Sequence, residues 1–166
     1  MRTAYRVLAY AIAIEVAIQA MAVVWAVAGL GKWIAGGGVA DASLMESEAT
    51  PFPEVAGFMI HGINGIFVVP LIALALMILS FFTRQRRPIL IAVALFVLVL
   101  VQGQLGFLGH EIPGIGALHG LNAFVLFVVA LYAARRLQIQ PRNGNKGSAD
   151  IAASGPTPTT GVPTGT

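Results

Sequence analysis

Four apolar runs, each about 20 residues or longer, constrain this chain more than any other feature. They cover about residues 7–31, 55–82, 88–108 and 115–134. A helix rises about 1.5 Å per residue, so roughly 20 apolar residues cross the ~30 Å hydrocarbon layer of a bilayer. The spans must be helical because lipid offers the backbone no hydrogen-bond partner. The sequence therefore predicts an all-α integral membrane four-helix bundle in a lipid bilayer.

The composition excludes several classes of function. Hydrophobic residues make up 57% of the chain and charged residues 10%, whereas a soluble domain carries roughly 25% charged residues. The net charge of +3 comes from a few Arg residues between the apolar runs, so we expect no nucleic-acid partner. The chain has no cysteine, which excludes disulfides, thiolate metal sites, iron–sulfur clusters and cysteine nucleophiles.

The first run also permits interpretation as a signal peptide, because Arg2 and Arg6 precede it and Ala26-Val27-Ala28 imitates a cleavage site. We favour a membrane span. The run exceeds the roughly 7–15 apolar residues of a signal peptide, and it contains Glu15 and Gln19, which an export segment does not need.

The cations predict the topology. Nine of the ten Lys and Arg residues lie before the first run, between the second and third, or after the fourth, and Lys32 is the exception. By the positive-inside rule, both termini and the connection at residues 84–87 are cytoplasmic. We therefore expect a multi-pass protein of the cell inner (plasma) membrane, with residues 32–54 and 109–114 facing outward.

The chain changes character after the fourth run. From Gln138 onward it is rich in Pro, Gly, Thr, Ser and Asn, and such a segment cannot bury enough apolar surface to offset its ordering entropy. The sequence therefore predicts a transmembrane domain over residues 1–137 and a disordered cytoplasmic tail over residues 138–166.

A five-residue motif opens both the second and the fourth span. It reads His61-Gly-Ile-Asn-Gly in the second and His119-Gly-Leu-Asn-Ala in the fourth. The chain thus reads as two tandem helix hairpins, and a parallel repeat about the membrane normal brings equivalent residues to the same depth. His61 and His119 are expected to face each other roughly 9 Å below the outer boundary, His119 a little shallower.

Two facing histidines are the ligand set of a b-type heme held between helices, with apolar walls and small residues against the macrocycle. The candidate metal ligands are His61 and His119. Other candidate heme-binding residues are Asn64 and Asn122, three positions after the histidines, the small residues Gly65 and Gly106, and Gln102 in the third span. Lys32 is a candidate propionate partner, although a snorkelling side chain beside Trp33 is the favoured explanation.

A heme-free interpretation stays open. Gly and Asn are ordinary packing and hydrogen-bonding residues between membrane helices, and a histidine near a helix start can reach interfacial water. The protein would then be a structural subunit without a cofactor. Duplication of the whole motif favours the ligand pair.

The chain resembles one half of heme A synthase in three features. These are the four spans, the histidines that open the second and fourth spans, and the run Gln102-Gly-Gln-Leu-Gly106 that closes the third. The chain resembles more closely small four-helix bacterial membrane proteins that open the last span with His-x-x-Asn-Ala. This resemblance implies that His61 and His119 are axial heme ligands. The catalytic half of the synthase has a glutamate one turn before its first histidine, where this chain has Phe58, so heme hydroxylation is not expected. The functions that we expect are electron transfer, heme handling, or an accessory role in a respiratory or other membrane complex.

Glu15 supports a different hypothesis. It lies four residues before Gln19 within the first span, so the two share a helix face. A four-helix protein with one intramembrane glutamate resembles small proton-coupled drug exporters. This alternative explains Glu15 but not the repeated histidine motif. Pro70 in the second span removes one backbone hydrogen bond, and we expect it to kink the helix.

Overall fold

The structure, a computed structural model, describes residues 1–41 and 50–136. It contains four long helical segments and no strand within those ranges. They are α1 (Arg2–Ala35), the composite of η1 (Pro53–Val55), α3 (Ala56–Ile63), η2 (Asn64–Val68) and α4 (Val69–Phe81), then α5 (Arg86–Glu111) and α6 (Pro113–Arg136). All four are long and apolar enough to cross a membrane. The predicted all-α four-helix membrane bundle is confirmed, and the predicted tail at residues 138–166 lies outside the described residues.

The helices extend beyond the apolar runs at both ends. α1 begins at Arg2 and α6 ends at Arg136, because interfacial Arg residues continue a helix without cost to its backbone bonds. The α5–α6 connection is shorter than the predicted turn and consists of Ile112 alone. His110 and Glu111, expected in that turn, form the last turn of α5 and are exposed.

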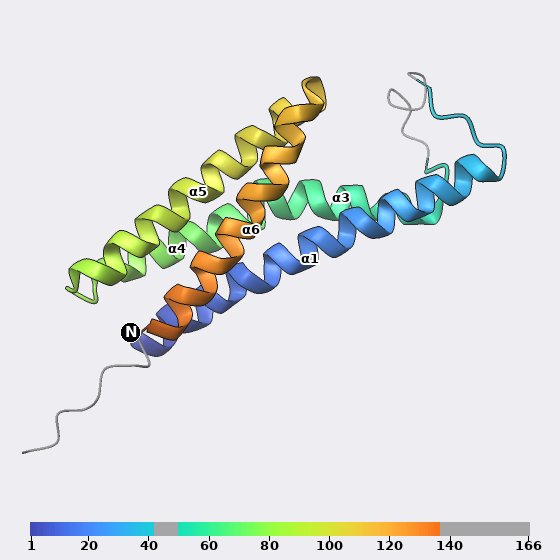
Figure 1. The fold of residues 1–166 in the computed structure, drawn as a ribbon. Coiled ribbons are helices and arrows are strands. Elements are labelled where there is room, and N and C mark those ends of the chain that lie inside the picture. Colours follow the sequence, from blue (N-terminus) through green and yellow to red (C-terminus); the bar gives the residue numbers. More distant parts are fainter. Residues whose placement is uncertain (42–49, 137–166) are drawn as a thin grey trace, which may run out of the picture.

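One end of the bundle carries the basic side chains, and we call it the basic end. The start of α1, the α4–α5 turn and the end of α6 all lie there (Figure 1). Around this end each helix packs against two neighbours, in the order α1, α4, α5, α6 and back to α1. The basic residues of this end are Arg2, Arg6, Arg84, Arg86, Arg87, Arg135 and Arg136.

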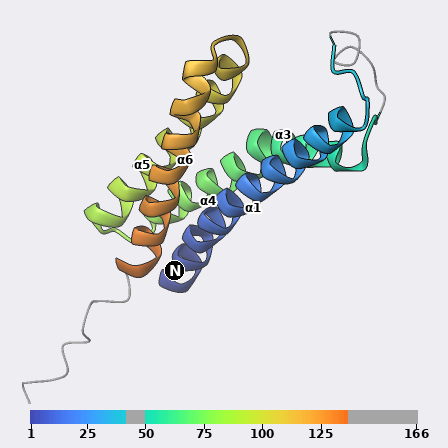
Figure 2. The same cartoon turned by 45° about the vertical axis from the view of Figure 1, so that its right-hand side comes forward.

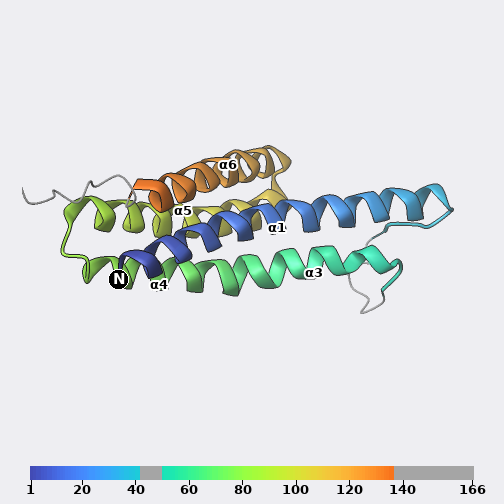
Figure 3. The ribbon, with the colours of Figure 1, turned by 90° about the horizontal axis from the view of Figure 1, so that it is seen from below.

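The hydrophobic core fills only the half of the bundle next to the basic end. α1 contributes to the core no further than Ala13 and α5 no further than Val99, whereas α4 and α6 enter it at Val69 and Leu126. Beyond those positions, α3 packs chiefly against α1, and α5 packs against α6. The two hairpins diverge in this half (Figure 2), and α1 and α3 continue side by side past the ends of α5 and α6 (Figure 3).

The two hairpins are joined at the base of the core by Tyr5. Its side chain is 1% exposed, and its hydroxyl donates to the carbonyl oxygen of Pro88 over 3.1 Å. This bond links the first turns of α1 and α5. It lies where both helices enter the core, so it helps to fix the position of one hairpin relative to the other along the bundle axis.

We expect Tyr5→Phe to lower the free energy of unfolding by about 1 kcal/mol, the typical net value of one hydrogen bond. The substitution keeps the ring in its buried site and removes only the donor. Denaturant titration of the purified protein, followed by circular dichroism, measures the change. Tyr10→Phe is the matched control, because the Tyr10 hydroxyl makes no hydrogen bond within the described chain. An equal loss in both variants would contradict the role given to Tyr5.

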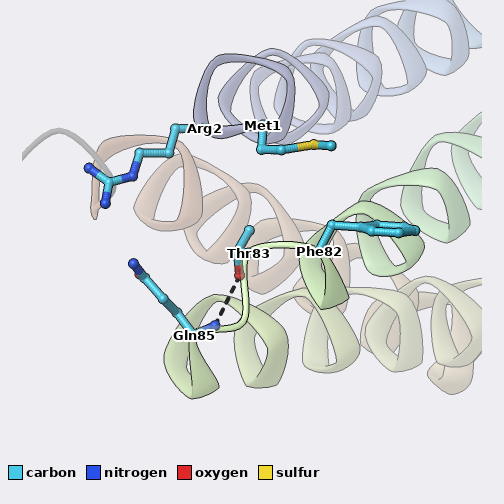
Figure 4. A pocket seen from close by; sticks show the side chains of 5 residues that line it. All are labelled: Met1, Arg2, Phe82, Thr83 and Gln85. Carbon is cyan, nitrogen blue, oxygen red and sulfur yellow. Dashed lines mark hydrogen bonds between the residues drawn. The ribbon is translucent and has the colours of Figure 1, made fainter.

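A shallow pocket lies at the basic end, between the start of α1 and the α4–α5 turn. Its lining residues are Met1, Arg2, Phe82, Thr83 and Gln85 (Figure 4). The N–H of Gln85 donates to Thr83 Oγ1 over 3.3 Å. This pocket is separated from the repeated histidines by the whole hydrophobic core.

The π-helical turn η2 interrupts the second span just before Pro70. There the N–H of Val69 bonds to the carbonyl of Asn64, five residues earlier, so η2 holds one residue more than an α-helical turn would. The structure thus has a π turn just before Pro70, the position where the sequence predicts a kink.

That extra residue changes the register of the internal repeat. Before η2, the second and fourth spans correspond at a spacing of 58 residues, as in His61 and His119. After η2 the buried positions correspond at a spacing of 57. The pairs are Val69 with Leu126, Ala73 with Ala130, and Leu76 with Ala133. Both hairpins thus place a histidine at equivalent positions before η2 and buried apolar residues at equivalent positions after it.

Candidate functional site

A layer of polar side chains lies where the hydrophobic core ends and the hairpins begin to diverge. All of its members are partly buried. Each hairpin contributes a glutamine from its first helix and a histidine and an asparagine from its second. The first hairpin adds one carboxyl group. We call this set the polar layer: Glu15, Gln19, His61, Asn64, Gln102, His119 and Asn122.

The two histidines face each other across the two hairpins. Their ring centroids are 5.9 Å apart, and the ring planes meet at 67°. His61 comes from α3 and His119 from α6, two helices that otherwise have little contact. The repeat therefore places both imidazoles at one point of the bundle, as the sequence predicts.

Gln102 holds His119 at both ring nitrogens. Nδ1 lies 3.0 Å from the backbone oxygen of Gln102, and because a carbonyl only accepts, Nδ1 carries the proton. Nε2 then has the free lone pair, which accepts from Gln102 Nε2 over 3.1 Å. His119 is thus a neutral imidazole in the tautomer that can bind a metal through Nε2.

Gln19 holds His61 in the first hairpin. In the amide orientation that satisfies its neighbours, Gln19 Nε2 donates to the His61 carbonyl (2.9 Å) and to Nδ1 (2.7 Å), while Oε1 accepts from the N–H of Gly65 (3.3 Å). In a regular α-helix the His61 carbonyl and the Gly65 N–H would bond to each other. The Gln19 amide contacts both of these groups at the point where the π turn begins.

The two asparagines anchor each hairpin internally. Asn122 Nδ2 donates to Gln102 Oε1 (2.7 Å) and to the backbone oxygen of Leu98 (3.1 Å). Asn64 Nδ2 donates to Glu15 Oε2 over 3.1 Å. Positions of α1 and α5 correspond at a spacing of 83, as in Gln19 and Gln102, so Glu15 corresponds to Leu98. Each asparagine therefore bonds to the same position of its partner helix.

Glycines make room for these contacts and leave space beside them. A Cβ at Gly106 would lie only 3.2 Å from His119 Cε1, whereas one at Gly65 would be in ordinary contact with the Gln19 amide, at 3.6 Å. Next to the histidines, a Cβ on Gly62 or Gly120 would meet no atom within 4 Å. The polar layer is therefore closely packed around Gly106, whereas there is free space beside Gly62 and Gly120.

Most of the residues expected from the sequence meet in this layer, and Lys32 does not. His61, His119, Asn64, Asn122, Gln102, Gly65 and Gly106 lie together. Lys32 is exposed in the last turn of α1, thirteen residues beyond Gln19 and hence about 20 Å along the helix axis. The sequence reasoning did not place Gln19 in the site. Its correspondence to Gln102 was the available signal.

The donor set fits a heme better than a bare ion. A tetrahedral metal site takes four protein ligands or three and a water, yet no third His, Asp or Glu joins the histidine pair within residues 1–41 and 50–136. A porphyrin brings its own equatorial nitrogens and needs only two axial ligands. Metal–imidazole bonds of about 2 Å on either side of one ion place two ring centres roughly 6 Å apart, close to the observed 5.9 Å.

Ligand binding requires two amides to rearrange. The Gln102 amide covers Nε2 of His119 and must turn away from it. At His61, a half-turn of the Gln19 amide presents oxygen in place of nitrogen to Nδ1, which then carries the proton and frees Nε2. That turn gives up both the bond to the His61 carbonyl and the bond from the Gly65 N–H.

Comparison of the chain with protein-family models, with curated proteins and with solved structures gives no match.

Proposed function

We propose that this protein binds one b-type heme between His61 and His119 and transfers electrons within the membrane. The observation that supports it is the histidine pair itself. Two equivalent imidazoles from two hairpins face each other at 5.9 Å, at the level where the core ends and the hairpins diverge. Burying such polar groups in a bilayer costs free energy, and intramembrane polar clusters usually mark a function.

The protein's own residues would hold and orient the heme. His61 and His119 supply the axial nitrogens, Gln19 and Gln102 bind the ring nitrogens opposite the iron, and Asn64 and Asn122 fix the helices that carry the histidines. When bound between two histidines, heme supplies reversible one-electron transfer. Heme handling and service as an accessory subunit of a respiratory or other membrane complex use the same site.

The proposed location is the inner (plasma) membrane, with the basic end and both termini in the cytoplasm. Tyr5 and Pro88 lie level with each other at the base of the core. Gln19 and Gln102 each lie fourteen residues further along, about 21 Å along the helix axis. In a ~30 Å hydrocarbon layer the heme would lie in the outer half.

The exporter hypothesis has one observation in its favour, the Glu15 carboxyl within the bundle. That carboxyl is bonded to Asn64 in the histidine layer, so it belongs to the same site as the ligand pair. The heme-free subunit accounts for packing by Gly and Asn, but not for two histidines held by two glutamines. The heme hypothesis uses the whole layer.

Optical spectroscopy tests the proposal. Purified in detergent from heme-replete cells, the protein should show a Soret band, and dithionite should produce the sharp alpha band of a six-coordinate b-type heme. A folded but colourless protein that also takes up no hemin on titration would overturn it. Circular dichroism of the same sample establishes the folded state.

A further inference from the structure

The two hairpins build matching halves of the polar layer with one difference. In the second hairpin, Asn122 bonds to the backbone oxygen of Leu98. In the first, Asn64 bonds to the side chain of Glu15, at the equivalent position. An uncharged acceptor is therefore sufficient to anchor this asparagine. The negative charge of Glu15 is thus not needed for this anchor.

Glu15 has no cation of its own. Its side chain is partly buried, and the Asn64 amide is its hydrogen-bond partner. Within residues 1–41 and 50–136, it forms no ion pair with a Lys or Arg. A carboxylate in an apolar bundle is costly without an opposite charge nearby. The titratable groups that share its layer are the two histidines, one on α3 and one on α6.

We propose that Glu15 supplies the counter-charge to the oxidised heme between His61 and His119, an inference that rests on the proposed function. Ferric iron in a porphyrin with two neutral imidazoles carries one net positive charge at its centre, and reduction by one electron removes it. A carboxylate beside the site stabilises the oxidised form relative to the reduced form. Glu15 is thus a positioning residue for charge and binds no metal itself.

Replacement of the carboxylate should raise the midpoint potential of the heme. We expect Glu15→Gln, which keeps the side-chain length and an acceptor oxygen for Asn64, to favour the reduced form about tenfold, or 59 mV for a one-electron couple. One unit charge roughly 10 Å from another, at an effective dielectric constant of about 20, has an effect of this order. Redox titration of the alpha band measures the potential. Glu111→Gln is the matched control, since it removes the same charge from an exposed position at the end of α5.

A double variant that moves the carboxylate to the other hairpin provides a second test. In Glu15→Gln with Leu98→Glu, the carboxylate moves to the equivalent position beside Asn122, and the potential should return toward that of the wild type. An unchanged potential in Glu15→Gln overturns the inference while leaving the heme proposal intact. Equal shifts in Glu15→Gln and Glu111→Gln also overturn it, because they indicate a general effect of surface charge. Folded wild-type protein that is colourless and takes up no hemin instead rejects the heme proposal.

Discussion

His61→Ala and His119→Ala are each expected to abolish the reduced alpha band of the six-coordinate heme. Each variant deletes one axial ligand, and no third His, Asp or Glu in the described part of the chain can replace it. The expected loss is complete at the six-coordinate band, with heme content falling at least tenfold after purification. Absorbance spectra and a pyridine hemochrome assay of the purified variants measure both quantities.

His110→Ala is the control for these variants. His110 lies exposed in the last turn of α5 and takes no part in the polar layer, so its removal should leave both bands unchanged. Comparable helicity of all three variants by circular dichroism shows that the lost band reflects a lost ligand. If His61→Ala or His119→Ala retained the full alpha band, the assignment of that residue as a ligand would be wrong.

The sequence predicted the helices and the histidine pair because both depend on short-range or repeated patterns. Apolar runs of about 20 residues leave one stable backbone conformation in lipid. The duplicated motif places His61 and His119 on equivalent helices, and equivalence alone brings them to one depth. Neither argument needs side-chain contacts.

The register of the second span could not be predicted in the same way. Pro70 indicated a kink, but a missing donor does not determine whether the chain kinks or widens into a π turn. At the start of η2 the chain also contacts Gln19, a residue of another helix, whose amide lies against the His61 carbonyl and the Gly65 N–H. A contact between residues 46 positions apart in the sequence leaves no local pattern.

Lys32 and Glu15 show a second limit of the sequence. Lys32 was a candidate because it is the only cation on its side, but α1 is longer than the membrane span and carries it well past the histidines. Glu15 was assigned to a competing hypothesis, since nothing in the sequence pairs it with Asn64. The positions of charges along the chain predict which side of the membrane each connection faces. Which charges lie around a site can be known only from the packing of the helices.

A close approach of the α3 backbone to α1 at Gly57 leads to the largest expected effect on stability. Gly57 is buried, and a Cβ there would overlap the backbone oxygen of Ala22 and lie 3.0 Å from Ala26 Cβ. A backbone atom in a helix cannot move aside as a side-chain tip can, so the two helices must separate. We expect Gly57→Ala to lower the free energy of unfolding by about 1–3 kcal/mol, the usual cost of overpacking.

Gly31→Ala distinguishes this close contact from the intrinsic effect of glycine in a helix. Gly31 lies in the partner helix α1, and a Cβ there would meet no atom within 4 Å. Alanine should therefore stabilise α1 by up to about 1 kcal/mol, because glycine is the poorer helix former. Denaturant titrations in one detergent give both values. Opposite signs for the two variants are the expected result, since the same chemical change meets backbone at Gly57 and open space at Gly31. Equal signs would show that α3 does not approach α1 this closely.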